Sequence, residues 1–293
     1  MNRLLSEKRR MIVASLVEGN SINATCRMAG VSKNTVLKLL GDLGLVCSIH
    51  QDTVMRNLTC ERIQIDEIWS FVYAKQKNVP PDTRGQAGDV WTWVAIDADT
   101  KLVPTYRIGP RDGREAIEFL DDLEKRLSNR VQLTSDGLPV YVQAVMETFG
   151  VEVDYAMLQK VYGSDSSRKP ERRYSPAVCL DAIPTPVFGN PDPDHISTSY
   201  VERLNLTTRM SVRRYTRLTN AFSKKLENYV AAVSLHFMHY NFVRVHQTLN
   251  TTPAVAAGVA DKAWKIDDLI VLLSDAENAV PMKRVPYKKR DAA

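Results

Sequence analysis

Hydrophobic and polar positions divide this chain into a helical beginning, a central part with strand character and a helical end. In residues 6–44 apolar residues recur at helical spacing in three short segments, SEKRRMIVASLVEG, SINATCRMAG and SKNTVLKLLGDLG. Each segment begins with a serine in a position suited to an N-cap, namely Ser6, Ser21 and Ser32. We therefore predict three helices in a first domain, residues 1–45. A linker or a short helix of mixed polarity is expected in residues 46–60.

The period changes at residue 61, where segments rich in Val, Ile, Trp and Tyr begin. Three of them, RIQIDEIWSFVY, DVWTWVAIDADT and KLVPTYRIG, are typical of consecutive strands. A helix (DGREAIEFLDDLEKRL), a strand (VQLTSDG), a helix (LPVYVQAVMETFG) and a short strand (VEVDYAML) follow. This order predicts an α/β protein whose mixed sheet carries helices on its faces.

Six of the 14 prolines fall in residues 160–199, so no regular element is predicted there. Helices are expected again over about 199–217 and 221–246. We assign residues 61–250 to this second domain. The remainder, 251–293, is expected to be a helical segment with a basic tail.

Charge is distributed unevenly, although the formal net charge of +5 is only mildly basic. Residues 203–225 contain seven Lys or Arg and no acid, and the tail MKRVPYKKRDAA is basic too. A basic stripe is typical of proteins that bind a phosphate backbone, and a solvated helix face is the alternative.

The turn AGVSKNTV between the second and third predicted helices is typical of a helix-turn-helix. A plain helical bundle, or one that contacts protein, is the alternative. In the helix-turn-helix interpretation, four side chains at the start of the third helix would face DNA: Lys33, Asn34, Thr35 and Lys38.

Other classes of protein are not supported. The four cysteines form no CxxC pair, which favours free thiols over a zinc site or a disulfide framework. No apolar run is long enough for a signal peptide or a membrane span, so we expect a cytoplasmic protein. Neither a Gly-rich phosphate loop nor a serine or cysteine nucleophile motif is present.

Three acids far apart in the sequence stand where a metal-dependent nuclease needs ligands. Asp66 interrupts an apolar strand, Asp136 ends another strand, and Glu202 opens the basic helix. A lone ionised carboxylate in a sheet core is costly, so Asp66 calls for a partner. Carboxylates from two strands and a helix can hold two divalent metals roughly 3.5–4 Å apart, which clamp a phosphodiester.

Each of these acids has an alternative. Glu67, on the opposite face of the strand, is the second choice as ligand. Asp136, before Gly137, also suits a turn, and a turn is the preferred interpretation of Asp97. His236, His239 and His246 are expected to pack rather than to bind metal. Trp69, Trp91 and Trp93 fall at strand spacing and are expected in the core of the sheet, whereas Tyr200 and Tyr215 suit packing and base stacking equally.

The segments QIDEIWSFV, LTSDGLPVY, SYVERLNLTTRMSVRRYTRLTNAFSKKLENY and HYNFVRVHQTL also carry a family resemblance. Over about residues 65–250 the chain resembles the DDE transposases of bacterial insertion sequences, most closely the insertion sequence one family. The resemblance implies a ribonuclease-H-like catalytic domain with Asp66, Asp136 and Glu202 as the triad. Asp66 would bridge two Mg²⁺ ions, with Mn²⁺ tolerated, and each of the other acids would hold one.

The implied activity is cleavage of double-stranded DNA at element ends and strand transfer into target DNA, by a homodimer or higher oligomer in the bacterial nucleoid. The residues expected to contact this DNA from the basic helix are Asn205, Arg209, Arg213, Arg214 and Arg217. A DNA-binding regulator on an inactive catalytic fold, and a nuclease that cuts without joining, are the alternatives.

Overall fold

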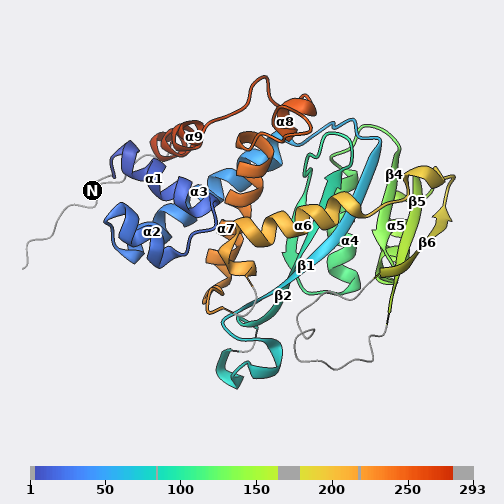
Figure 1. Ribbon diagram of the computed structural model, residues 1–293, viewed down its shortest axis with the longest axis horizontal. Coiled ribbons are helices and arrows are strands. Elements are labelled where there is room, and N and C mark those ends of the chain that lie inside the picture. Colours follow the sequence, from blue (N-terminus) through green and yellow to red (C-terminus); the bar gives the residue numbers. More distant parts are fainter. Residues whose placement is uncertain (1–3, 84, 164–178, 217–218, 280–293) are drawn as a thin grey trace, which may run out of the picture.

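A six-stranded mixed sheet forms the centre of the computed structural model, which describes residues 4–83, 85–163, 179–216 and 219–279 (Figure 1). The strands are β1 (Arg62–Val72), β2 (Gly88–Asp97), β3 (Tyr106–Gly109), β4 (Val131–Asp136), β5 (Val153–Tyr162) and β6 (Cys179–Phe188). Their order in the sheet is β3-β2-β1-β4-β5-β6. β1, β2 and β3 form an antiparallel meander, β4 and β5 run parallel to β1, and β6 returns antiparallel. The predicted mixed sheet is confirmed.

Helices cover both faces of this sheet. α4 (Gly113–Glu124) and α5 (Val140–Phe149) lie on one face, and α6 (Ser199–Ser211) crosses β1 and β2 on the other (Figure 1). β1 is therefore buried from both sides and alternates between the two layers. Its Gln64 accepts hydrogen bonds from the first turn of α6, whereas Glu67 meets Tyr141 of α5. Asp66, on the Gln64 face, consequently lies under α6.

Three helices precede the sheet: α1 (Ser6–Val17), α2 (Ile22–Ala29) and α3 (Lys33–Val54). Ser21 accepts a hydrogen bond from Ala24 N, and Ser32 accepts one from Thr35 N, so both predicted caps are confirmed. The prediction for Ser6 is wrong, because Leu5 occupies the N-cap position and no side chain caps α1. Between α2 and α3, Gly30 adopts a left-handed φ of 63°, which a residue without Cβ reaches at no steric cost.

The third helix does not end near Gly44, as its sequence suggested, but continues through Val54. The segment interpreted as a linker or short helix is thus mostly the second half of α3. Gly44 allows close contact with α7 (Leu226–Met238), because a Cβ there would lie 2.6 Å from the Cα of Ala231. Ser234 Oγ donates to Gly44 O at 2.7 Å, and Gln51 Nε2 donates to Ser234 O at 3.3 Å. Tertiary packing therefore overrides the two glycines that suggested a helix end.

The strand β6 was not predicted. Its sequence, CLDAIPTPVF, contains Pro184 and Pro186 and is almost wholly exposed, so it shows neither a buried face nor a strand period. Both prolines are tolerated because β6 is the last strand of the sheet and pairs on one side only, with β5.

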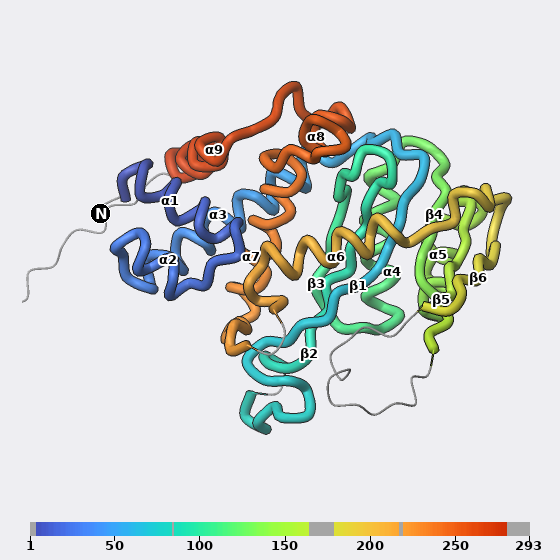
Figure 2. The backbone as a smooth tube through the Cα atoms, viewed as in Figure 1, coloured from blue at the N-terminus to red at the C-terminus, as the bar shows by residue number. Residues whose placement is uncertain are grey.

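The rest of the chain is helical and partly irregular. α6 ends at Ser211, a 3₁₀ turn covers Arg213–Tyr215, and α7 passes into a π-helical turn, His239–Val243. Short 3₁₀ turns also occur at Gln76–Asn78, Pro81–Thr83 and Pro193–His195. The first two belong to the β1–β2 connection, which projects from the body in Figure 2.

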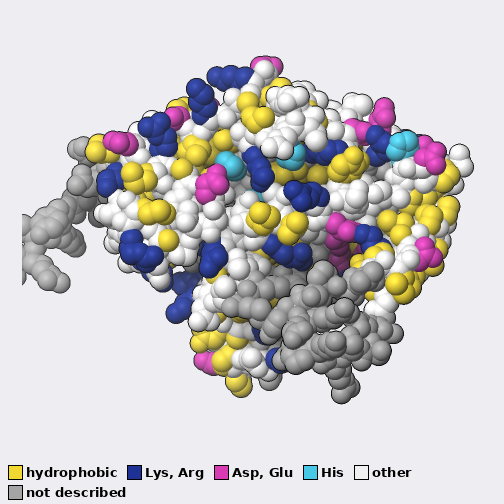
Figure 3. Space-filling model, viewed as in Figure 1, with side chains coloured by type: hydrophobic (Ala, Val, Ile, Leu, Met, Phe, Trp, Pro, Cys, Tyr) yellow, Lys and Arg dark blue, Asp and Glu magenta, His cyan; other side chains and the backbone are white. Residues whose placement is uncertain are grey.

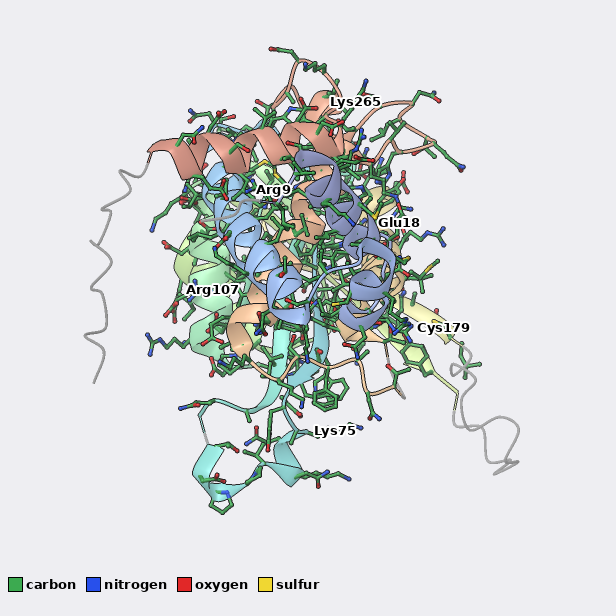
Figure 4. All side chains as sticks on the ribbon, turned by 90° about the vertical axis from the view of Figure 1, so that its left-hand side faces the viewer. Arg9, Glu18, Lys75, Arg107, Cys179 and Lys265 are labelled. Atoms are coloured by element: carbon green, nitrogen blue, oxygen red, sulfur yellow. The ribbon has the colours of Figure 1, made fainter. Side chains whose placement is uncertain are left out.

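The last described elements return to the beginning of the chain. α8 (Pro253–Ala256) is followed by α9 (Ile266–Ala279), which packs on α1 and α3. Arg9 of α1, which lies beneath α9 in Figure 4, pairs with Glu277 at 3.1 Å. The predicted basic tail lies outside the described residues. Within those residues, no helix is long and apolar enough to cross a membrane.

Candidate active site

The three predicted acids line one cleft of about 820 Å³ at the centre of the sheet. Asp66 comes from the middle of β1, Asp136 from the end of the adjacent β4, and Glu202 from the first turn of α6. Acidic and basic side chains meet beside α6 in Figure 3, and Lys and Arg groups extend from there toward the N-terminal helices. Sheet topology therefore gathers residues that are distant in sequence.

Asp66 is held by two hydrogen bonds and surrounded by negative charge. Its Oδ1 accepts from the backbone N–H of Glu67 at 2.8 Å, and its Oδ2 accepts from Asn205 Nδ2 at 2.6 Å. The pKa of Asp66 is raised to about 7, mainly by burial and then by the charges of Glu67, Asp136 and Glu202, while the backbone hydrogen bond from Glu67 opposes the rise. A carboxylate in this setting gains from a nearby cation.

Asp136 serves a turn and faces the cleft at once. Its Oδ1 accepts from Leu138 N at 3.0 Å, which is the turn geometry expected of an Asp before Gly137. The alternative interpretation of Asp136 as a turn residue is therefore correct. It does not exclude a second role, because the residue also lines the cleft.

Glu202 is the most exposed of the three acids, with a side chain 44% accessible. Its Oε1 accepts from Thr198 Oγ1 at 2.7 Å and forms an ion pair with Lys160 of β5. Lys160 crosses from the sheet to α6, so the helix carrying Glu202 is tied to the strand on the far side of β4.

Glu67, the second choice as ligand, points away from this cluster. Its side chain is 1% exposed, pairs with Arg111 Nε at 2.5 Å and accepts from Tyr141 Oη at 2.9 Å. Burial raises the pKa of Glu67, and Arg111 opposes that rise. Both oxygens are already engaged, so Glu67 suits positioning better than metal binding. Asp97 is confirmed as a turn residue, since it accepts from the backbone of Thr100 at 3.1 Å.

The cations expected along the basic helix lie in different environments. Arg209 and Asn205 line the cleft, and Arg213 is exposed. Arg214 is half-buried, and its Nε donates to Ser223 Oγ at 2.6 Å. Burial lowers the pKa of Arg214 to about 10. Arg217 lies outside the described residues.

The four side chains expected to face DNA in the helix-turn-helix interpretation lie at the start of α3. Lys33, Asn34 and Lys38 are exposed, and Lys38 pairs with Asp42 one turn further along. Thr35 is half-buried, and its hydroxyl lies 2.9 Å from Ser32 Oγ.

The charged and hydroxyl-bearing cleft residues that escaped sequence analysis include Arg111, Lys160 and Thr198. Arg111 follows the end of β3, and Lys160 lies on β5 where the prolines had suggested irregular structure. The only available signal for Thr198 was its place four residues before Glu202, one helical turn away.

The histidines expected to pack do so. His236 is buried, and its Nε2 lies 3.2 Å from Thr208 Oγ1 of α6. Burial lowers the pKa of His236 to about 3 and that of His239 to about 4. His246 packs edge-on against Tyr240, with the two ring centroids 5.0 Å apart.

The aromatic residues divide into two groups. Trp93 is fully buried, as expected of a core residue, and Tyr215 Oη lies 2.6 Å from Thr92 Oγ1 inside the protein. Tyr200 is 43% exposed with Lys101 over its ring. Trp69 and Trp91 are only partly buried, so the prediction that they lie in the core is wrong for both.

The donor set in the cleft suits a hard divalent cation. Carboxylate and amide oxygens are the ligands that Mg²⁺ prefers, and Asn205 Oδ1, although buried, has no hydrogen-bond partner among the described residues. In the same part of the chain, no three His, Cys, Asp or Glu side chains are arranged ready to hold one ion. The ion pair and hydrogen bonds of Glu202 would have to open for it to join Asp66 and Asp136.

No protein-family model and no curated protein matches the chain. Among solved structures, the chain is similar to Mos1 transposase in a paired-end complex with the left transposon end, at 14% identity and a TM-score of 0.24. That alignment covers 53% of this chain and 59% of the other, so the chain spans about three fifths of that relative. A piggyBac transposase synaptic complex with hairpin DNA is similar over 95% of this chain and 73% of that one, at 10% identity and a TM-score of 0.43. These solved structures are transposases.

Proposed function

We propose that the chain is a transposase that cuts DNA at the ends of an insertion sequence and joins those ends to target DNA. The observation that carries the proposal is the convergence of Asp66, Asp136 and Glu202 on one cleft from β1, β4 and α6. The strand order β3-β2-β1-β4-β5 supports a ribonuclease-H-like catalytic domain of the DDE type, with β6 as an added edge.

Asp66, Asp136 and Glu202 would hold the divalent metal, Mg²⁺ or Mn²⁺. When bound, a metal pair supplies Lewis-acid stabilisation of the phosphodiester and a lowered pKa for the attacking hydroxyl. The side chains of the protein position the reacting groups. Asn205 orients the Asp66 carboxylate through its 2.6 Å hydrogen bond.

The cleft also offers groups for the DNA backbone. Arg111 and Arg209 line it with the acids, and Lys160 lies at its edge in an ion pair with Glu202. Glu202 would help to hold the metal, and Lys160, its present ion-pair partner, would be the cation for a nearby phosphate. Both chemical steps, hydrolysis and transesterification, are in-line displacements at phosphorus, so one arrangement of acids and cations serves both.

We assign recognition of the DNA sequence to α1–α3, as a helix-turn-helix. The turn at Gly30, the cap at Ser32 and the exposed Lys33, Asn34 and Lys38 at the start of α3 support it. Strand transfer brings two ends together, so the active species would be a homodimer or larger assembly.

The test is a cleavage and strand-transfer assay with labelled DNA carrying the terminal sequences that flank the gene. It compares the wild type with Asp66→Asn and Glu202→Gln, in Mg²⁺ and in Mn²⁺. Glu147→Gln is the matched control, because Glu147 is exposed on α5 outside the cleft. We expect joined products in the wild type and the control, and none in the two site variants although both still bind DNA.

Two other outcomes would overturn the proposal. Cutting without joining would identify a nuclease of the same fold. Binding without cutting in either metal would identify a DNA-binding regulator on an inactive catalytic fold.

A further inference from the structure

A row of partly exposed aromatic side chains lies on the Glu67 face of the sheet, next to the cleft residue Arg111, and has no role in the reaction proposed above. Trp69 and Phe71 of β1 have ring centroids 5.8 Å apart, and Phe71 lies 5.0 Å from Phe222. Trp91 of β2 is the direct cross-strand partner of Trp69. All four side chains are only partly buried. We call these four residues the aromatic ledge.

The backbone segments that carry the ledge are held together by the sheet and its neighbouring bridge. Trp69 and Phe71 occupy the same face near the end of β1, and the segment containing Phe222 runs alongside, since Ser223 forms a parallel bridge with Val72. The backbone N–H of Tyr73 also donates to Ser223 O at 2.8 Å. Three neighbouring extended segments thus fix the rings relative to one another.

Two cations accompany the rings. Lys75 Nζ lies 5.5 Å from the centre of the Trp69 ring, and the guanidinium carbon of Arg111 lies 4.8 Å from that of Trp91. Lys75 is exposed at the base of the projecting β1–β2 connection, as Figure 4 shows. The nearby Asp89 carboxylate is already engaged by the backbone N–H of Gln76.

Arg111 connects the ledge to the cleft. It lines the cleft together with Asp66 and Asp136, pairs with the buried Glu67 and covers one face of Trp91. Arg111 therefore belongs to both sites, and Trp91 and Trp69 are the rings that a DNA strand would reach if it passed from the cleft over Arg111 to the Glu67 face of the sheet.

We propose that the aromatic ledge binds unpaired nucleotides of the DNA strand next to the cut. Surfaces that bind single strands combine aromatic rings, on which bases stack, with cations that follow the phosphates. Base pairs inside a duplex cannot stack on these rings, because both of their faces are covered by neighbouring pairs. This inference rests on the proposed function for the position of the strand, and its test does not require cleavage.

The test measures binding of two DNAs by fluorescence anisotropy in Ca²⁺, so that binding is read without turnover. One DNA is a blunt duplex, and the other is the same duplex with a short single-stranded thymidine tail. The proteins are the wild type, Trp69→Leu, Trp91→Leu and the conservative Trp69→Phe. Trp264→Leu is the matched control, a partly buried tryptophan that packs on His50 and Phe242 instead.

We expect the wild type and Trp264→Leu to prefer the tailed duplex by at least about fivefold, the lower end of one stacked base. Trp69→Leu and Trp91→Leu should lose this preference but keep their affinity for the blunt duplex, and Trp69→Phe should keep most of it. Circular dichroism melting checks that each variant folds. A wild type without preference, or a preference that survives both leucine variants, overturns the proposal.

The two proposals fail separately. Tail preference in a protein that never cuts DNA would leave the ledge intact and remove the transposase. Cutting and joining by a protein without tail preference would support the transposase and overturn the ledge proposal.

Discussion

Asn205 of α6 donates its side-chain amide to Asp66 of β1 at 2.6 Å, across the contact between helix and sheet. Asn205 is 4% exposed, so water does not easily replace it. The bond fixes one oxygen of the central carboxylate, and a hydrogen bond to a charged group contributes about 1.5–3 kcal/mol. The helix that carries Glu202 thus also orients Asp66.

Replacing Asn205 with alanine should therefore slow DNA cleavage by roughly 10- to 100-fold, the rate equivalent of that hydrogen bond. Single-turnover cleavage at saturating metal measures it. Met210→Ala, a change at a side chain 73% exposed on the same helix, is the control and should leave the rate unchanged. An unchanged rate in Asn205→Ala would show that Asp66 needs no such orientation.

Asp66 should make the metal-free protein less stable as the pH rises. Its pKa is raised to about 7 in the folded state from an ordinary value of 3.8, so the folded protein binds this proton more tightly than the unfolded chain. The resulting stabilisation is complete below about pH 4 and is lost as the pH rises through about 7. Asp66→Asn, which cannot ionise, should have a higher Tm than the wild type at pH 8 and a similar one at about pH 4.

The measurement is thermal melting in EDTA at both pH values, repeated with Mg²⁺. Metal should raise the Tm of the wild type at pH 8 and have little effect on Asp66→Asn. An equal metal response in the two proteins would argue against Asp66 as a ligand.

Arg111→Met should destabilise the fold by about 3 kcal/mol, because it leaves Glu67 buried without its cation. The value is at the low end for a buried pair, since the Arg111 side chain is 38% exposed. Glu67→Gln combined with Arg111→Met should recover much of the loss, because the glutamine carries no charge. Urea unfolding of the single and double variants measures the coupling. Additive losses would show that the pair does not act as a unit.

Gly44→Ala should weaken the contact between α3 and α7. The added Cβ would lie 2.6 Å from Ala231 Cα, and relieving such overlap costs about 1–3 kcal/mol. Gly41→Ala, in the same helix with nothing within 4 Å of its Cβ position, is the control. It should instead stabilise by about 0.5–1 kcal/mol, because alanine favours helix. Urea unfolding distinguishes the two, and equal behaviour would show that the helices can separate.

The sequence indicated the sheet and the location of the three acids because those features have local signals. The apolar strand around Asp66 has a period, and Glu202 follows directly on a proline-rich break. The missed features depend on tertiary contacts. α3 continues past Gly44 because α7 packs there, β6 forms because β5 offers an open edge, and Arg111 reaches the cleft from a loop. No local pattern in the sequence encodes these contacts between distant elements.

The partial burial of Trp69 and Trp91 has the same origin. Their strand spacing is that of core residues, and Trp93, with the same spacing, is indeed buried. Only the arrangement of the covering helices decides which tryptophans they shield, since α4 and α5 reach Trp93, whose ring lies 6.2 Å from Phe119 and 5.7 Å from Tyr141.

α3 is a single helix of 22 residues, which makes it about 33 Å long, close to one turn of B-form DNA. Its first residues are exposed, whereas its later part is locked to α7 through Gly44 and Gln51, and α7 is linked to α6 through His236 and Thr208. Such a helix fixes the distance between its first residues and the part that is packed on α7. In the proposed function, DNA bound at the beginning of α3 would be held at a set distance and rotational phase from the acids. Inserting or deleting half a helical turn of DNA between the two proposed contacts would then place the wrong face of the duplex at the cleft.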